Sequence, residues 1–177
     1  MASVVVPFRA GKSRLTLPPQ ERTELALSML EAVVSAAVEV GQTLVVTEDA
    51  AGRSLAEQLG AGVVADPGGG QGIAVAAGLA TVTSVPALVV NADLPLATAD
   101  DLHALAEAAP AFVAARDGTT NALALVDAAA FRSLYGAGSA HRFAALGLRA
   151  VHLPNLVEDV DTVADLERLR LSWATAP

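Results

Sequence analysis

Short apolar runs alternate with longer amphipathic segments along most of the chain. The first five apolar runs are continuous rather than alternating, as expected for strands that are covered on both faces of a sheet. We expect strands at 3–7, 43–47, 62–65, 87–91, 111–115, 122–126 and 149–153. The segments between these runs repeat apolar residues with the period of a helix. We expect helices at 20–40, 50–59, 72–83, 98–108, 140–146 and 162–173.

The residues at the ends of these segments agree with the assignment. Thr98 precedes a helix whose first turn holds Asp100 and Asp101, which predicts an N-cap. Gly41 and Gly60 follow two of the expected helices and predict their ends. The repeated alternation of strand and helix predicts an α/β fold with three layers: a doubly wound, mostly parallel sheet with helices on both faces. In such folds the strand-end loops lie along one edge of the sheet, where ligands bind.

Composition and charge narrow the class of protein. The chain has 177 residues, with no repeat, linker or shift of composition, so we expect a single domain over residues 1–177. Its net charge of -8 argues against binding to nucleic acid or to an anionic membrane. Cysteine is absent, which excludes disulfides, thiolate metal sites and a cysteine nucleophile, and fits a reducing compartment. The first apolar stretch is too short for a signal or a transmembrane span, so we expect a cytoplasmic protein. The helices rich in alanine and valine suit a homodimer as well as an ordinary core.

The loop after the first strand concentrates positive charge. Arg9, Lys12 and Arg14 lie within six positions around Gly11, and Lys12 is the only lysine of this acidic chain. Backbone N–H groups in such a loop can hold a polyphosphate while the cations offset its charge. The spacing is not that of a Walker motif, and a solvated loop with ordinary basic residues is the alternative.

A second candidate is the glycine-rich turn before the third expected helix. It contains Gly69, Gln71 and Gly72 in the run Asp66-Pro67-Gly68-Gly69-Gly70-Gln71-Gly72. Four glycines remove side-chain bulk, so a flat base or a ribose can approach the backbone, and Gln71 can read the edge of a base. A flexible turn without a ligand is the alternative.

Two acidic segments are candidates for a metal site. Asp93 follows the strongest strand signal, in Asn91-Ala92-Asp93-Leu94-Pro95, and a carboxylate at that edge of the sheet can hold a divalent cation that bridges phosphates. Asp161, in a distant segment before the last helix, supplies a second carboxylate for a Mg²⁺ site. The structural alternatives are an Asx-turn at Asp93 and a helix cap at Asp161.

A fourth candidate lies near residues 117–141. Gly136 and Gly138 leave backbone N–H groups exposed before a helix for which Ser139 is the expected cap. Such a helix start is an anion site, and an ordinary capped helix is the alternative.

Taken in order, these segments resemble the 2-phospho-L-lactate and phosphoenolpyruvate guanylyltransferase family, which makes the activated intermediate for the deazaflavin coenzyme F-420. The resemblance covers nearly the whole chain, from Lys12-Ser13-Arg14-Leu15 to Asp159-Val160-Asp161-Thr162. It is most specific at Thr120-Asn121-Ala122-Leu123 and at the Gly136-x-Gly138-Ser139 loop. The Asp-Leu-Pro and Asp-Val-Asp-Thr elements are shared with the wider nucleotidyltransferase superfamily and imply its MobA-like fold, that of the nucleotide-diphospho-sugar transferases.

The resemblance also implies roles for individual residues. Mg²⁺ would be held by Asp93 and Asp161, with Asn91 at a position where the family usually has another metal-binding aspartate. The phosphate of the acceptor acid would lie against Thr120, Gly136 and Ser139. GTP would lie against the first loop and the glycine-rich turn, through Arg9, Gly11, Gly69, Gln71 and Gly72. Besides Asp93, the catalytic set would include two cations that balance the departing pyrophosphate, Lys12 and Arg14.

The implied reaction moves GMP from GTP onto phosphoenolpyruvate or 2-phospho-L-lactate. The chain departs from the family pattern at Asn91, which removes one negative charge, in a shorter first loop, and at Ala137, where a proline is common. Two alternatives stay open: a nucleotidyltransferase with another acceptor, such as molybdopterin or a sugar phosphate, and a non-catalytic nucleotide-binding paralogue. The lone Trp173 and Tyr135 offer little surface for stacking a pterin, which favours a small acid.

Overall fold

The computed structural model describes residues 1–11 and 15–174, with side chains to residue 169, so the predicted Lys12 and Arg14 lie outside the described residues. Its strands are β1 (Ala2–Pro7), β2 (Gly41–Val46), β3 (Gly62–Val64), β4 (Ala87–Val90), β5 (Ala111–Ala114), β6 (Thr120–Leu125) and β7 (Arg149–Ala150). Its helices are α1 (Pro19–Val40), α2 (Ala50–Gln58), α3 (Gln71–Leu79), α4 (Ala99–Glu107), α5 (Ser139–Ala145), α6 (Pro154–Val157) and α7 (Val163–Ala174), with a 3-10 turn at Ala128–Ala130.

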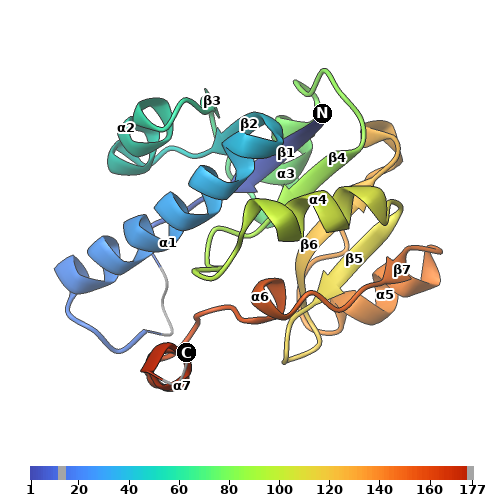
Figure 1. The fold of residues 1–177 in the computed structure, drawn as a ribbon. Coiled ribbons are helices and arrows are strands. Elements are labelled where there is room, and N and C mark those ends of the chain that lie inside the picture. The colour runs from blue at the N-terminus through green and yellow to red at the C-terminus, as the bar shows by residue number, and fades with distance from the viewer. Residues whose placement is uncertain (12–14, 175–177) are drawn as a thin grey trace.

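The strands form one sheet in the order β3-β2-β1-β4-β6-β5-β7 (Figure 1). The first four strands of the chain pair in parallel, as do β5 and β7, whereas β6 runs antiparallel to both of its neighbours. Residues 115–119 connect β5 to β6, and this link is too short for a parallel crossover, so the two strands form a hairpin. The predicted α/β class with a mostly parallel sheet is confirmed. The reversed strand was not predicted.

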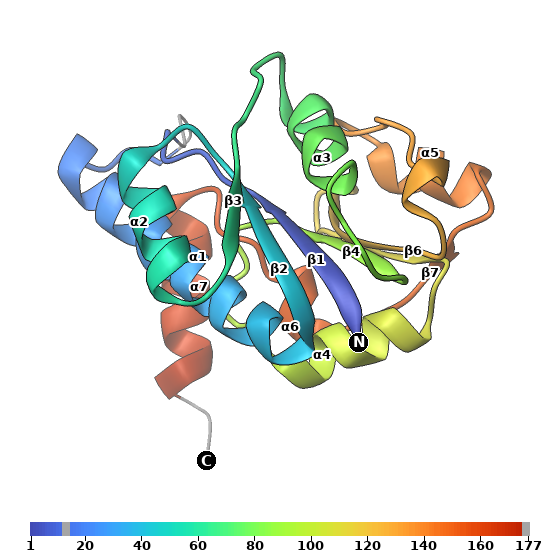
Figure 2. The same ribbon diagram turned by 90° about the horizontal axis from the view of Figure 1, so that it is seen from above.

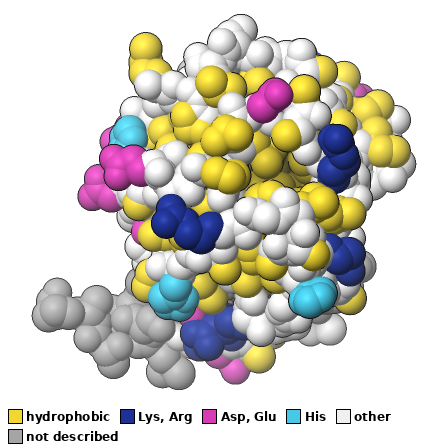
Figure 3. Space-filling model, turned by 90° about the vertical axis from the view of Figure 1, so that its right-hand side faces the viewer, with side chains coloured by type: hydrophobic (Ala, Val, Ile, Leu, Met, Phe, Trp, Pro, Cys, Tyr) yellow, Lys and Arg dark blue, Asp and Glu magenta, His cyan; other side chains and the backbone are white. Residues whose placement is uncertain are grey.

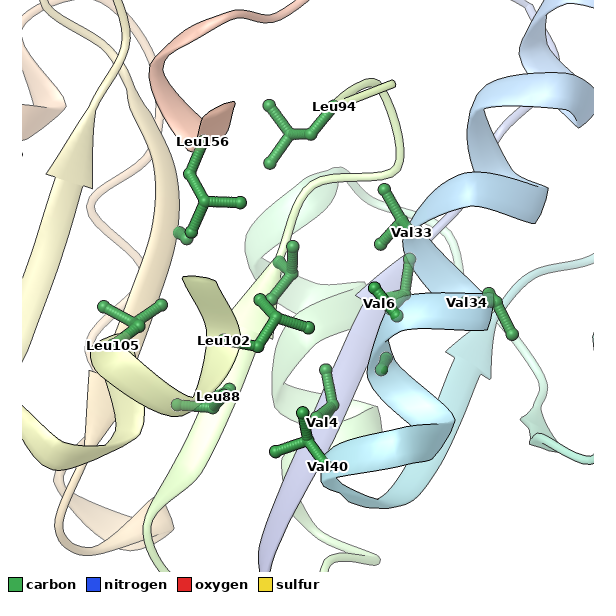
Figure 4. Packing of buried hydrophobic residues seen from close by; sticks show 14 of the residues in the cluster. Val4, Val6, Val33, Val34, Val40, Leu88, Leu94, Leu102, Leu105 and Leu156 are labelled. Atoms are coloured by element: carbon green, nitrogen blue, oxygen red, sulfur yellow. The ribbon is translucent and has the colours of Figure 1, made fainter. Parts of the chain in front are cut away.

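Helices cover both faces of the sheet, as Figure 2 shows from above. Along β1, Val4 and Val6 contribute to one core and Val5 to the other, because successive side chains point to opposite faces. Helices α1, α2, α4 and α6 close the first core, and α3 and α5 close the second. In Figure 4, Leu102 and Leu105 of α4 lie in the first core with the β1 valines. Each such buried leucine stabilises the fold by about 1.5–3 kcal/mol.

A third, smaller core holds the C-terminal helix in place. Leu15, Met29 of α1, Val160 and Leu169 of α7 are all buried in it. Val160 is fully buried, so the segment just before α7 is fixed against α1 and the first loop rather than extending into solvent.

The ends of several elements follow the sequence. Thr98 caps α4 in a capping box with Asp101, as predicted. Gly60 follows α2 with a φ of 85°, a left-handed conformation that favours glycine. Gly41 is the C-cap of α1, as predicted, and β2 begins at the same residue without an intervening turn. A Cβ atom at Gly41 would lie 2.1 Å from the backbone oxygen of Ala2, so glycine lets β2 pair closely with β1.

Other boundaries shift by a few residues. Helix α3 ends at Leu79 instead of residue 83, and β7 stops at Ala150 because the chain turns toward α6, which begins at Pro154. Strand β6 begins at Thr120, so a residue expected in a loop belongs to the sheet.

The surface and the helices give two further observations. On the face at the right of Figure 1, basic, acidic and apolar side chains are interspersed (Figure 3). Within the described part of the chain, no helix combines the length and the hydropathy that a membrane crossing requires.

We predict that Gly41→Ala lowers the free energy of unfolding by about 1–3 kcal/mol, because the added methyl group overlaps the backbone of β1. The matched control is Gly11→Ala, where a Cβ meets nothing within 4 Å, and we expect a change within about 0.5 kcal/mol. Urea unfolding of both variants measures the difference. Equal stabilities would contradict the close approach of β1 and β2.

Candidate active site

Three carboxylates meet beyond the end of β4. Asp93 follows that strand, and Asp159 and Asp161 lie in the segment that leads to α7. One oxygen from each of the three lies within 4.8 Å of the others. The structure therefore brings together Asp93 and Asp161, as predicted, and adds Asp159, which we had not assigned as a ligand. The alternating Asp-Val-Asp pattern contained that signal, since alternation places both carboxylates on the side opposite a buried Val160.

Backbone hydrogen bonds join the two acidic segments. The Val160 N–H donates to the Asp93 carbonyl oxygen at 3.1 Å. The side-chain amide of Asn121, at the start of β6, donates to the carbonyl oxygens of Leu156 at 3.0 Å and Val157 at 3.3 Å. These contacts attach α6 and the segment after it to the ends of the central strands, so the carboxylates are held close together by the fold.

Thr162 and Asp165 make the side-chain contacts at the start of α7. The Thr162 hydroxyl accepts from the Asp165 N–H at 3.3 Å, and the Asp165 carboxylate accepts from the N–H groups of Thr162 at 2.8 Å and Asp161 at 3.1 Å. Thr162 and Asp165 therefore form the capping interaction, rather than Asp161.

Two arginines neutralise the acids that flank the cluster. Glu158 accepts from Arg116 and from Arg168, the latter at 3.0 Å, and Arg168 also donates to Asp165 at 2.7 Å. The hydrogen bond from Arg116 lowers the pKa of Glu158. Burial raises the pKa of Asp165, but the bonds from Arg168 and Thr162 outweigh it and leave the pKa at about 2. Both flanking acids are thus ionised and paired at neutral pH.

The pKa of Asp159, in contrast, is raised rather than lowered. Burial raises its pKa to about 6, and the nearby charges of Asp93 and Asp161 add to the effect. Three carboxylates held this closely favour a cation among them, and carboxylate oxygens are the ligands that Mg²⁺ prefers. The donor set therefore fits a hard divalent ion.

Two hollows open on either side of this cluster. The first has a volume of about 260 Å³ and is lined by Pro7, Phe8, Arg9, Gly11, Ala26, Met29, Asp66, Gln71, Ala74, Asn91, Ala92 and Asp93. The second, of about 410 Å³, is lined by Gly11, Gln71, Asn91, Asp117, Thr119, Thr120, Asn121, Tyr135, Gly136, Ala137, Ser139, Asp159 and Asp161. Asp93 lines the first hollow and its two partners line the second, so the cluster lies where the hollows adjoin.

The first hollow joins two of the predicted nucleotide segments. Arg9 donates to Asp66 at 2.7 Å, which ties the first loop to the glycine-rich turn. This hydrogen bond lowers the pKa of Asp66. The Arg9 side chain is still 53% exposed, which leaves part of its guanidinium open to a ligand. Arg9, Gly11 and Gln71 therefore come together as predicted.

The two other glycines of the predicted nucleotide set lie apart from the hollow's lining. Gly72 is buried in α3, and a Cβ atom there would lie 1.6 Å from the Ser133 hydroxyl oxygen, so close packing accounts for this glycine. Gly69 adopts a φ of 81° beside Ile73, as a tight turn requires. Their contact with a nucleotide stays a prediction.

Asn91 and Gln71 form the wall that the two hollows share. The Gln71 side-chain N–H₂ donates to the Asn91 side-chain oxygen at 2.7 Å, and the Asn91 amide donates to the Thr120 carbonyl oxygen at 3.2 Å. Asn91 is thus engaged with its neighbours beside the three-carboxylate cluster. Its role as a metal ligand stays a prediction.

The second hollow contains the predicted acceptor residues. Thr120 and Ser139 are both buried, and their hydroxyl oxygens lie 3.0 Å apart. Ser139 is the first residue of α5 and Gly138 is the residue before it, so the expectation that Ser139 caps this helix was wrong. Gly136 adopts a φ of 101° at the rim. The buried Tyr135 hydroxyl has no hydrogen-bond partner within the described residues.

Comparison with known proteins gives the class. Residues 8–152 match the family model of the MobA-like NTP transferase domain. Among solved structures, a candidate nucleotide-diphospho-sugar transferase from Desulfovibrio desulfuricans G20 superposes with a TM-score of 0.77 at 14% identity, covering 99% of this chain and 88% of that one. A nucleotidyl transferase from Methanothermobacter superposes with a TM-score of 0.68 at 17% identity, covering 98% of both chains. Fold and site thus define a nucleotidyltransferase of the MobA-like class.

Two relatives of similar sequence identify the family within this class. The phosphoenolpyruvate guanylyltransferase of Streptomyces coelicolor is 39% identical, over 99% of this chain and 92% of the relative. The protein of the same name from Sphaerobacter thermophilus is 36% identical, over 93% of this chain and 90% of the relative. The chain belongs to the phosphoenolpyruvate guanylyltransferase family, and the resemblance found in the sequence is confirmed.

We predict that Asp159→Asn raises the unfolding temperature of the metal-free protein at about pH 7.5. The raised pKa of about 6 means that folding disfavours the charged form, so the cost is present above that pH and disappears as the carboxyl protonates toward its ordinary value of 3.8. Thermal scans in a chelator between these limits should show the gain shrinking as the pH falls. Asp100→Asn, at an exposed position in α4, is the control and should show no such gain. Destabilisation by Asp159→Asn across the whole range would contradict the crowding of the three acids.

Proposed function

We propose that this protein transfers GMP from GTP to phosphoenolpyruvate or a closely related phospho-acid and releases pyrophosphate. The observation that carries the proposal is the three-carboxylate cluster between two hollows, since a cation held there would be close to a phosphorylated substrate in each hollow. The names of the relatives support the choice of nucleotide and acceptor. With that acceptor, the product would be the activated intermediate of coenzyme F-420 biosynthesis.

The two hollows differ in chemistry, which supports their assignment. Phe8 and Met29 give the first hollow an apolar wall suited to a base, and Arg9 lies at its opening, suited to phosphates. The second hollow presents the hydroxyls of Thr120 and Ser139, suited to a phosphate or carboxylate. We therefore place GTP in the first hollow and the phospho-acid in the second.

The transfer needs alignment more than it needs a strong base. A phosphate oxygen of the acceptor forms a bond to the α-phosphorus of GTP, and the bond from that phosphorus to the bridging oxygen of pyrophosphate breaks. A phosphate monoester is ionised near neutral pH, so no side chain has to remove a proton from the attacking oxygen. The loops of the two hollows orient the reactants, which accounts for much of the acceleration in such reactions.

The carboxylates complete the proposed mechanism. Asp93, Asp159 and Asp161 would hold Mg²⁺, which when bound offsets phosphate charge and favours attack at phosphorus. Asp93 faces the nucleotide side and the other two face the acceptor side. Their separation between the hollows suits a cation shared by both substrates.

We predict that Asp93→Asn lowers pyrophosphate release by about 10²–10³-fold or more, since it removes a charge that would hold the cation. The fold should survive, because the loop is held through the backbone oxygen of Asp93 and not through its side chain alone. A coupled pyrophosphate assay and thermal unfolding measure the two effects. Asp127→Asn, at an exposed turn, is the control and should keep full activity. Turnover that survives in Asp93→Asn would refute the assignment.

A screen of substrates tests the proposal as a whole. Four nucleoside triphosphates are crossed with phosphoenolpyruvate, 2-phospholactate, 3-phosphoglycerate and a sugar phosphate, with Mg²⁺ and with a chelator. We expect GTP with phosphoenolpyruvate to give the fastest release of pyrophosphate, and only with the metal. Turnover with the sugar phosphate alone would assign a different acceptor. GTP binding by calorimetry without turnover in any combination would indicate a non-catalytic protein.

A further inference from the structure

Arg142 of α5 organises the loop that borders the second hollow. Its guanidinium donates to four successive backbone carbonyl groups of residues 134–137. The shortest contacts are 2.7 Å from Nη1 to Ala137 and 2.9 Å from Nη2 to Leu134. Nη2 also reaches the carbonyl oxygens of Tyr135 at 3.1 Å and Gly136 at 3.3 Å. One side chain therefore determines how this stretch of backbone is oriented.

The orientation of the carbonyl groups determines that of the amides. In a planar trans peptide the C=O of one residue and the N–H of the next point in opposite directions. With the carbonyls of 134–137 directed at Arg142, the N–H groups of residues 135–138 are directed away from it. Tyr135, Gly136 and Ala137 line the second hollow, whereas Arg142 is absent from its lining.

These amides are available to a ligand. Within the described residues, none of the N–H groups of 135–138 donates to another protein group. Gly136 and Gly138 have φ values of 101° and 72°, and successive residues with such changes of φ allow neighbouring N–H groups to converge on an anion. The half-buried positive charge of Arg142 behind the loop adds a favourable field for that anion.

We propose that Arg142 is a positioning residue for the acceptor: it holds the 134–138 loop so that the loop's amides bind an anionic group of the phospho-acid. The inference rests on the proposed function for the identity of that acid. Arg142 does not touch the acceptor and acts through the backbone. This role was not predicted from the sequence, because an arginine inside an expected helix usually lies on the surface.

Arg142→Lys tests the role. Lysine keeps the positive charge but loses the planar fork that reaches several carbonyl groups at once. We expect the KM for phosphoenolpyruvate to rise about tenfold or more, the value for losing charged hydrogen bonds of about 1.5 kcal/mol. The KM for GTP should stay within about twofold, because its hollow does not include this loop. Arg132→Lys is the matched control, since Arg132 is an exposed arginine that also donates to carbonyl oxygens, those of Ala129 and Phe131, and it should leave both values unchanged.

The outcomes distinguish a failure of the positioning role of Arg142 from a failure of the proposed function. Thermal unfolding shows whether each variant is folded at the assay temperature, and Arg142→Gln, which keeps two amide donors, replaces Arg142→Lys if that variant unfolds. Equal KM values for phosphoenolpyruvate in wild type and variant, or equal rises for both substrates, would overturn the positioning role. Absence of turnover in the wild type with every acid would overturn the proposed function instead. Phosphoenolpyruvate is then titrated into wild type and variant by calorimetry with Mg²⁺ present: weaker binding by the variant supports the role, and equal or undetectable binding to both overturns it.

Discussion

The site depends on one backbone contact, the hydrogen bond from the Val160 N–H to the Asp93 carbonyl oxygen. Val160 is buried between α1 and α7, so burial and hydrogen bonding hold the same residue from two sides. Because Asp159 and Asp161 flank Val160, fixing that residue places both carboxylates beside Asp93. The C-terminal helix therefore contributes to the site although none of its described side chains lines either hollow.

Electrostatics explains why this arrangement is compatible with an acidic chain. Arg116 and Arg168 pair with Glu158, Arg168 also pairs with Asp165, and Arg9 pairs with Asp66. Glu158, Asp165 and Asp66 are thus paired locally, whereas burial, together with repulsion by the nearby charges of Asp93 and Asp161, raises the pKa of Asp159. The proposed divalent cation would remove that repulsion, so its binding would stabilise the fold.

The two hollows place a candidate substrate site on each side of the carboxylate cluster. They share Gly11 and the Gln71–Asn91 amide pair, and the cluster presents carboxylates to each. An arrangement of this kind suits a direct transfer between two phosphorylated molecules. Such a transfer needs no covalent enzyme intermediate. The arrangement also agrees with the family. Solved structures at 14% and 17% identity have the same fold, and two relatives at 36–39% identity are both named phosphoenolpyruvate guanylyltransferase.

The sequence by itself determined most of the elements, though not α6, and it pointed to many of the residues that line the candidate site. Apolar runs and helical periods gave the strands and helices, because both depend on neighbours a few positions away; the Thr98 cap and the Gly60 helix end are local in the same sense. Asp93, Asp161, Thr120 and Gly136 were found from motifs and all lie around the second hollow and the cluster. Only the tertiary structure showed the reversal of β6, the third carboxylate at Asp159, the capping role of Thr162 and the reach of Arg142. The third carboxylate and the pairing of β6 with β4 depend on which distant segments pack together, which the order of residues does not specify. The Thr162 cap and the reach of Arg142 are close in sequence, but they depend on side-chain conformations that only the packed structure fixes.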